Sequence, residues 1–258
     1  MSLVLPQELI TRPDEHGEQI NAYYGNAAAD LTAIGDGLRF VFICFTNRCG
    51  SHFLAEALAS SDVLNNAGEM FHADIVIGDS KAYGLHDLGA YVGHLARSNQ
   101  RNGILVSKLS VTQMGMLAQA GILDHILTRT SFILLERDDK LAQAISYALA
   151  LGSGRWTSAH EADVALEDVP FAPEVVAGFI GGIATELSLF HRFFGLNGIV
   201  PIHVSYETLD AMPGSIVPWV GKRLGLPDLM FTPSTLRLQR QASQVNQAWR
   251  ERFLARDR

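Results

Sequence analysis

One short stretch constrains the fold of this chain more than any other, and it begins at residue 40. Residues 40–45 are apolar or favour β structure, which predicts a buried strand. A polar turn with Gly50 follows, and over residues 51–60 the apolar side chains recur at helical spacing. A strand, a tight loop and a helix in this order present backbone N–H groups at the helix N-terminus, where an anion can bind.

The loop also carries two side chains suited to a phosphate. Arg48 can fork two hydrogen bonds onto one phosphate, and Ser51 adds a hydroxyl donor. The loop is not a Walker A motif, because Phe45 stands in place of the first glycine and no lysine follows Gly50. A strand-to-helix turn with a surface arginine is the alternative, and the loop alone leaves both interpretations open.

Strands and helices alternate through the rest of the chain. The apolar patterns predict further strands at residues 104–109, 131–136 and 199–204. They predict further helices at residues 88–97, 113–127, 140–151, 173–194, 212–224 and 246–256. The alternation predicts an α/β protein with a mainly parallel central sheet flanked by helices. We expect residues 1–38, with a short helix near residues 27–32, to form an N-terminal arm packed on one domain of residues 39–258.

The composition and the cysteine positions limit the compartments and the binding partners that we expect for this protein. A net charge of −7 argues against a nucleic-acid surface, which would need a basic stripe. No apolar run approaches the roughly 18 residues of a membrane helix, and the first residues reach Pro6 and Glu8 too early for a signal peptide. Cys44 is expected in a strand and Cys49 in the loop, so we expect no disulfide. These features predict a cytoplasmic protein that binds neither nucleic acid nor membrane.

A second arginine follows the third predicted strand. Arg137 stands where that strand ends, and Ser146 lies on the helix that comes next. Ligands of parallel α/β sheets gather beyond the carboxyl ends of the strands, and Arg48 and Arg137 both lie at such ends. Two arginines at two strand ends suit a ligand with two separate phosphates. The alternative is a solvated ion pair of Arg137 with Glu136 or Asp138.

With these two motifs the chain resembles the sulfotransferases, and in particular the small bacterial family typified by trehalose sulfotransferase. In that family a loop of the Arg-Ser-Gly-Ser-Thr type binds the 5′-phosphosulfate of phosphoadenosine phosphosulfate (PAPS), and a segment of the Arg-x-Asp-x-x-x-Gln-Ala-x-Ser type holds its 3′-phosphate. Residues 47–52 and 137–146 resemble these two segments. The resemblance runs from about residue 39 to the end of the chain and includes residues 69–71, 107–109, 154–156, 240–242 and 249–253.

The resemblance implies a P-loop-like sulfotransferase fold, PAPS as the co-substrate, PAP as the product, and no metal. It implies that Glu69 is the general base for an acceptor hydroxyl and that Arg48 stabilises charge on the leaving side. The residues that it assigns to the nucleotide are Arg48, Cys49, Gly50, Ser51, His52, Arg137, Ser146 and Arg240.

The sequence departs from the family pattern at three loop positions, and at the first of them Asn47 stands where proline or glutamine is usual. Cys49 replaces a serine, and His52 replaces a threonine whose hydroxyl would contact phosphate. His52 can still donate a hydrogen bond, and it competes with Glu69 and His72 for the role of base. The spacing of the three residues Cys49, His52 and His72 fits no tight metal site.

Further residues carry weaker assignments. Lys108 can reach the transferring group, although a lysine at a strand end is usually solvated. Trp156 can stack on the adenine or line the acceptor site, and packing in the core is its alternative. Arg237 is a second candidate beside Arg240 for a C-terminal phosphate clamp.

Three functions therefore compete. The first is a PAPS-dependent sulfotransferase that acts on a hydroxyl of a carbohydrate or similar small molecule. The second is a non-catalytic relative that binds PAP or another nucleotide, and the third is a P-loop-type nucleotide kinase, which the missing Walker residues disfavour. Likeness to the family also leads us to expect a homodimer.

Overall fold

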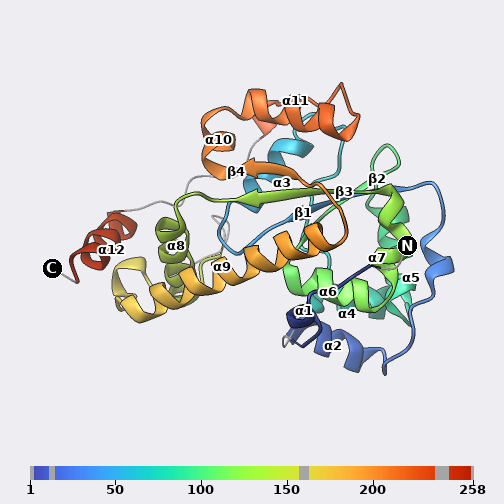
Figure 1. Cartoon of the computed structure of the whole chain (residues 1–258), viewed down its shortest axis with the longest axis horizontal. Coiled ribbons are helices and arrows are strands. Elements are labelled where there is room, and N and C mark those ends of the chain that lie inside the picture. The colour runs from blue at the N-terminus through green and yellow to red at the C-terminus, as the bar shows by residue number, and fades with distance from the viewer. Residues whose placement is uncertain (1–2, 12–14, 157–162, 236–243, 257–258) are drawn as a thin grey trace.

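The sheet has four parallel strands in the order β2-β1-β3-β4 (Figure 1). The strands are β1 (Arg39–Cys44), β2 (Ile104–Leu109), β3 (Thr130–Glu136) and β4 (Ile202–Ser205). The fold comes from a computed structural model, which describes residues 3–11, 15–156, 163–235 and 244–256. Because β1 lies between β2 and β3, the loop after β1 has one neighbouring strand end on each side.

Helices cover both faces of the sheet, so the predicted α/β class with a parallel sheet is confirmed. The α-helices are α1 (Gln7–Thr11), α2 (Glu15–Tyr23), α3 (Ser51–Ala59), α4 (Ala73–Tyr83), α5 (Leu88–Ser98), α6 (Val111–Gln119), α7 (Ile122–Ile126), α8 (Lys140–Ser153), α9 (Pro173–Leu196), α10 (Tyr206–Ala211), α11 (Pro213–Leu224) and α12 (Gln244–Ala255). Short 3-10 turns occur at η1 (Leu31–Ile34), η2 (Leu127–Arg129), η3 (Leu166–Asp168) and η4 (Pro233–Thr235).

Three predicted elements differ from the structure for local reasons. The helix expected over residues 113–127 is divided into α6 and α7 at Gly121, whose φ of 73° is left-handed. The strand expected from residue 199 begins at Ile202, because the N–H of Ile199 still bonds to the carbonyl of Phe194 at the end of α9. The helix expected near residues 27–32 is only the 3-10 turn η1, capped by Asp30.

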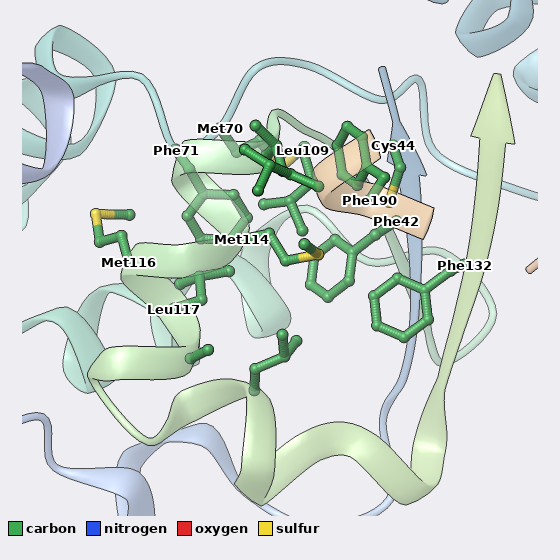
Figure 2. Close-up of a cluster of buried hydrophobic side chains, with 14 of the residues drawn as sticks. Phe42, Cys44, Met70, Phe71, Leu109, Met114, Met116, Leu117, Phe132 and Phe190 are labelled. Atoms are coloured by element: carbon green, nitrogen blue, oxygen red, sulfur yellow. The ribbon is translucent and has the colours of Figure 1, made fainter. Parts of the chain in front are cut away.

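Alternating side chains of β1 supply two separate cores. On one face Phe42 packs between Phe71 and Phe132, with ring centroids 6.2 and 6.0 Å away, as Figure 2 shows. On the other face Val41 and Ile43 are buried in a second cluster to which α3 and α11 contribute. A strand buried on both faces reads as a continuous apolar run, which explains residues 40–45.

Helix α9 is long and apolar enough, by length and composition alone, to cross a membrane. No such segment was predicted from the sequence. Its apolar positions include Val176, Ile183, Phe190 and Phe193, and these are buried in the phenylalanine-rich core while α9 also packs on α8. Core packing accounts for only part of its composition, because 28% of its most apolar 18-residue window is buried and Val175 and Leu196 are exposed. The absence of a membrane partner stays a prediction.

The free edge of β2 is covered by a loop that brings Glu69 to the end of the strand. The side-chain amide of Asn65 pairs with both the N–H and the carbonyl of Val106, at 2.8 Å each. Farther along, the N–H of Lys108 donates to the carbonyl of Gly68 at 2.9 Å. Asn65 thus binds the backbone groups of β2 that a neighbouring strand would otherwise pair with. Glu69 comes directly after Gly68, whose carbonyl accepts the last of these bonds.

Candidate active site

The β1–α3 loop (residues 45–50) has a tightly curled backbone. Arg48 has a φ of 63° and Gly50 a φ of 95°, both in the left-handed region. A Cβ atom at Gly50 would lie 2.3 Å from Cδ2 of Tyr206. Gly50 is therefore needed both for its backbone conformation and for the close approach of the Tyr206 ring. The chain enters α3 directly after this turn, so the first-turn N–H groups of that helix lie next to the loop.

Helix α8 fixes the loop from the β3 side of the sheet. The buried side-chain amide of Gln143 donates to Thr46 Oγ1 and to the carbonyl of Asn47, both at 2.8 Å. The amide of Asn47 donates to the hydroxyl of Tyr147 at 2.9 Å. Three bonds to one helix hold the loop in place before any ligand arrives, which lowers the entropy cost of binding.

Two arginines and a serine meet beside this loop. Nε of Arg48 donates to Oγ of Ser146 at 3.0 Å, and the same guanidinium donates to the carbonyl of Trp156. Arg137 donates to the carbonyl of Arg48 at 3.5 Å. Burial lowers the pKa of Arg48, and the charge of Arg137 lowers this pKa further. The structure thus brings together three of the residues predicted to bind the nucleotide.

Arg137 is not in the solvated ion pair considered above. Glu136 lies 3.2 Å from His191 instead, and the carboxylate of Asp138 accepts from Ser205 at 3.0 Å. Nε of Arg137 is buried and has no hydrogen-bond partner among the described residues. A buried guanidinium N–H without an acceptor is a costly arrangement that a bound anion would relieve.

Neighbouring carboxylates accept hydrogen bonds from the backbone that follows Arg137. Glu207 accepts from the backbone N–H groups of Asp138 and Asp139, at 2.9 and 3.2 Å. Asp139 caps α8 through the N–H of Ala142 at 2.9 Å and also lies 2.8 Å from Arg250 of α12. Asp139 is therefore the N-cap of α8, and its ion pair with Arg250 links the C-terminal helix to the site.

Tyr206 is a site residue that the sequence analysis missed. Besides contacting Gly50, its ring lies under the guanidinium of Arg137, with Cζ of Arg137 5.0 Å from the ring centroid. Tyr206 follows β4 directly, so the rule that identified Arg137, a side chain at the carboxyl end of a strand, also applies to it.

On the β2 side of the loop, Lys108 links two candidate bases. Its ammonium donates to Oε1 of Glu69 at 2.8 Å and to Nε2 of His52 at 2.9 Å. The Lys108 side chain is only 1% exposed, whereas that of His52 is 51% exposed. Lys108 is therefore not the solvated strand-end lysine of the alternative interpretation.

Charge and burial oppose each other at this ion pair. Burial alone would raise the pKa of Glu69, but the charge and the hydrogen bond of Lys108, together with the nearby His52 and His72, outweigh it and lower this pKa overall. Burial lowers the pKa of Lys108, and the charge of Glu69 partly offsets that effect. Glu69 is therefore an ionised carboxylate at neutral pH, as a general base must be.

A hollow of about 250 Å³ opens beside the ion pair. Its lining is both apolar and polar and comes from α3, from the loop that includes Glu69 and from β2. Its members are His52, Ala55, Glu56, Asn66, Ala67, Gly68, Glu69 and Lys108. Carboxylate, amide and imidazole groups of this kind suit a ligand with hydroxyl groups.

Three further candidate residues are His72, Cys49 and Ser51. His72 caps α4, because its Nδ1 accepts from the N–H of Asp74 at 3.4 Å, and its ring lies 4.1 Å from that of His16. Cys49 is buried, and burial raises the pKa of its thiol to about 12, so it carries no thiolate at neutral pH. Ser51 is the first residue of α3 and is also buried.

Arg237 and Arg240 lie outside the described residues. Within residues 3–11, 15–156, 163–235 and 244–256, no group of three or more His, Cys, Asp or Glu side chains is arranged to hold a metal ion. Trp156 is partly exposed and packs edge-on against Tyr147, with ring centroids 5.9 Å apart.

Comparison with known proteins gives one family. The sequence model described as Stf0 sulphotransferase matches residues 40–256, which is most of the chain. No curated protein matches the sequence significantly. The matched region begins with β1 and contains both the β1–α3 loop and the segment after β3.

Proposed function

We propose that this chain, which belongs to the Stf0 sulphotransferase family and is therefore a sulfotransferase, moves the sulfuryl group of PAPS to a hydroxyl of a carbohydrate or similar small molecule. The observation that carries the proposal is the carboxylate of Glu69, which is held by the buried Lys108 at the edge of a hollow. A carboxylate beside a hollow of this size is suited to take the proton of a hydroxyl.

The residues around the β1–α3 loop fit the donor. PAPS carries a 3′-phosphate and a 5′-phosphosulfate, and the loop has a cationic group on each flank. Arg137 and Ser146 are proposed to hold the 3′-phosphate, for which the buried Nε of Arg137 is a ready donor. The α3 N-terminus faces the anionic 5′ end, where its N–H groups and dipole favour negative charge.

The proposed reaction is an in-line displacement at sulfur. The acceptor oxygen forms a bond to the sulfur while the bond from sulfur to the bridging oxygen of the nucleotide breaks. The acceptor proton passes to Glu69, and PAP leaves with the electron pair of the broken bond. Positioning and charge stabilisation supply most of the rate, as in phosphoryl transfer.

The ion pair also suggests how Glu69 gains basicity. A carboxylate held by an ammonium is a weaker base than a free one. An anionic donor bound nearby competes with Glu69 for the Lys108 ammonium, and this competition raises the pKa of Glu69 when the acceptor is in place. Lys108 thus keeps the base ionised in the free enzyme and releases it in the complex with donor.

Calorimetry with PAP, with ATP and ADP as controls, tests the donor site, and mass spectrometry after incubation with PAPS and a disaccharide panel tests transfer. Selective PAP binding and a sulfated product support the proposal. Tight ATP binding would favour the nucleotide kinase instead, and PAP binding without transfer to any acceptor would favour the non-catalytic relative. A homodimer, cytoplasmic localisation, and the absence of nucleic-acid, membrane and metal partners belong to the same proposal and rest on the sequence alone.

A further inference from the structure

Glu69, Lys108 and His52 form one connected chain of hydrogen bonds. Nζ of Lys108 lies 2.8 Å from Oε1 of Glu69 and 2.9 Å from Nε2 of His52. Oε1 of Glu69 and Nε2 of His52 are themselves 4.0 Å apart, which is too far for direct proton transfer. The ammonium of Lys108 is therefore the bridge between the carboxylate and the imidazole.

These three side chains differ in their access to water. Glu69 lines the hollow in which the acceptor is proposed to bind, so an acceptor in the hollow covers its carboxyl group. The Lys108 side chain is buried, whereas the His52 side chain is half exposed although it also lines the hollow. Of the three groups, His52 is the one from which a proton can leave most easily to solvent.

The proton taken from the acceptor has to leave Glu69 before the next turnover. Burial lowers the pKa of Lys108, and a protonated Glu69 no longer offsets this effect with its charge, so the ammonium gives up a proton more easily. An imidazole is ordinarily more basic than a carboxylate by about two pKa units. Passage of the proton from the carboxyl group to the imidazole is therefore favourable.

We propose that His52 returns Glu69 to its ionised form after each transfer, by taking the proton through Lys108 and releasing it to solvent. One ammonium proton of Lys108 passes to Nε2 of His52, and the amine so formed takes the proton of the Glu69 carboxyl group. Nζ thus regains its full set of protons, and the resulting imidazolium loses a proton to water or buffer.

The inference rests on the proposed function, in which Glu69 is the base. It gives His52 a role after the transfer, which differs from the role of base for which His52 competes in the sequence. The family pattern has a threonine at this position, and a hydroxyl group cannot store a proton at neutral pH as an imidazole can. The relay is therefore a property of this chain and not of the family pattern.

Nuclear magnetic resonance on the free protein tests the tautomer that the relay requires. Long-range proton–nitrogen correlation at neutral pH shows which ring nitrogens of a histidine carry a proton, and the His52 signals are those absent from His52→Thr. Nε2 can accept from Lys108 only when it has no proton, so the ring proton should be on Nδ1. A proton on Nε2, in the neutral or in the charged ring, would overturn the inference.

Rapid-quench kinetics separate the transfer from the return of the base, with PAPS and the disaccharide that the parent sulfates fastest. In His52→Ala the first turnover should keep the parental rate, and later turnovers should be about tenfold slower or more. The variant should therefore show a burst of product, with a lower kcat and a nearly unchanged kcat/KM. Imidazole in the buffer should raise the later rate of His52→Ala severalfold and leave the parent unchanged, because the free ring can replace the missing side chain.

His86→Ala is the matched control, because it removes an exposed histidine between α4 and α5 and should behave as the parent does, with or without imidazole. A first turnover slowed as much as the later ones would place His52 in the transfer itself and overturn the inference. A steady rate equal to that of the parent would also overturn it. His52→Thr repeats the kinetic test if circular dichroism shows that His52→Ala is not folded.

Failure of the inference and failure of the proposed function have different signatures. A parent chain that forms no sulfated product overturns the proposed function, and the relay with it. A parent that transfers the sulfuryl group, beside a His52→Ala variant without a burst or without rescue by imidazole, overturns the relay alone.

Discussion

On the β3 flank of the β1–α3 loop, Arg48 and Arg137 lie close together, whereas on the β2 flank Lys108 is already bonded to Glu69. The first flank gathers positive charge and leaves the buried Nε of Arg137 without a partner among the described residues. The second flank neutralises its buried cation with a carboxylate and opens into a hollow. The first arrangement suits the binding of an anion, and the second suits the transfer of a proton.

The largest effect should come from removing the base on the β2 flank. Glu69→Gln keeps the size and hydrogen-bonding ability of the side chain but cannot take a proton, so turnover should fall by about a hundredfold or more. Steady-state kinetics measure turnover, and calorimetry should show unchanged PAP affinity. The matched control is Glu56→Gln, which alters the other carboxylate of the hollow. Equal losses in both variants would mean that Glu69 has no special role.

On the β3 flank, Arg137→Ala should have the opposite signature. Loss of charge-assisted hydrogen bonds to a phosphate should weaken PAP binding about tenfold to a hundredfold. Lys108→Met should leave PAP affinity much closer to that of the parent, because PAP has no sulfuryl group. Titration calorimetry on the two variants makes the comparison. If Lys108→Met loses more PAP affinity than Arg137→Ala, the division of the site into two flanks is wrong.

Between the flanks, Gly50→Ala should damage the loop itself. The left-handed backbone costs alanine about 1–2 kcal/mol, and the contact with Tyr206 adds to this. Chemical denaturation should therefore show a lower free energy of unfolding. The control is Gly178→Ala on the exposed surface of α9, where a Cβ meets nothing within 4 Å and helix propensity favours alanine by up to about 1 kcal/mol. A Gly50→Ala protein as stable as the parent would show that the loop can relax away from Tyr206.

The smallest effect is a shift in pH dependence. With Glu69 as the proposed base, activity should fall on the acid side as Glu69 becomes protonated, and Lys108 lowers the pKa of Glu69. In Lys108→Met, burial acts on Glu69 without this opposition, so its pKa rises and the acid limb of the kcat/KM profile moves to higher pH. Profiles of the parent and the variant, measured with one acceptor, provide the test. An acid limb that stays in place or moves to lower pH would contradict the assignment of the limb to Glu69.

Much of the fold could be predicted because its signals are local. Residues 40–45 are continuously apolar since β1 is buried on both faces, and the helical spacing after Gly50 needs no knowledge of the partner elements. Gly121 carried a usable signal for the break between α6 and α7, but the apolar periodicity on both sides concealed it. The pattern also placed Arg48 and Arg137 at strand ends, where ligands of parallel sheets bind.

The sequence by itself determined the order of strands and helices, the strand-loop-helix unit around Gly50 and the arginine at each of two strand ends. These depend on backbone preferences and on periodicity within single segments. Only the tertiary structure decided that Lys108 is buried between Glu69 and His52, that Tyr206 lies against Gly50 and that Arg48 extends to Ser146. Such contacts depend on the order of strands in the sheet and on side-chain direction, and residues far apart in the sequence meet only after the strands have paired.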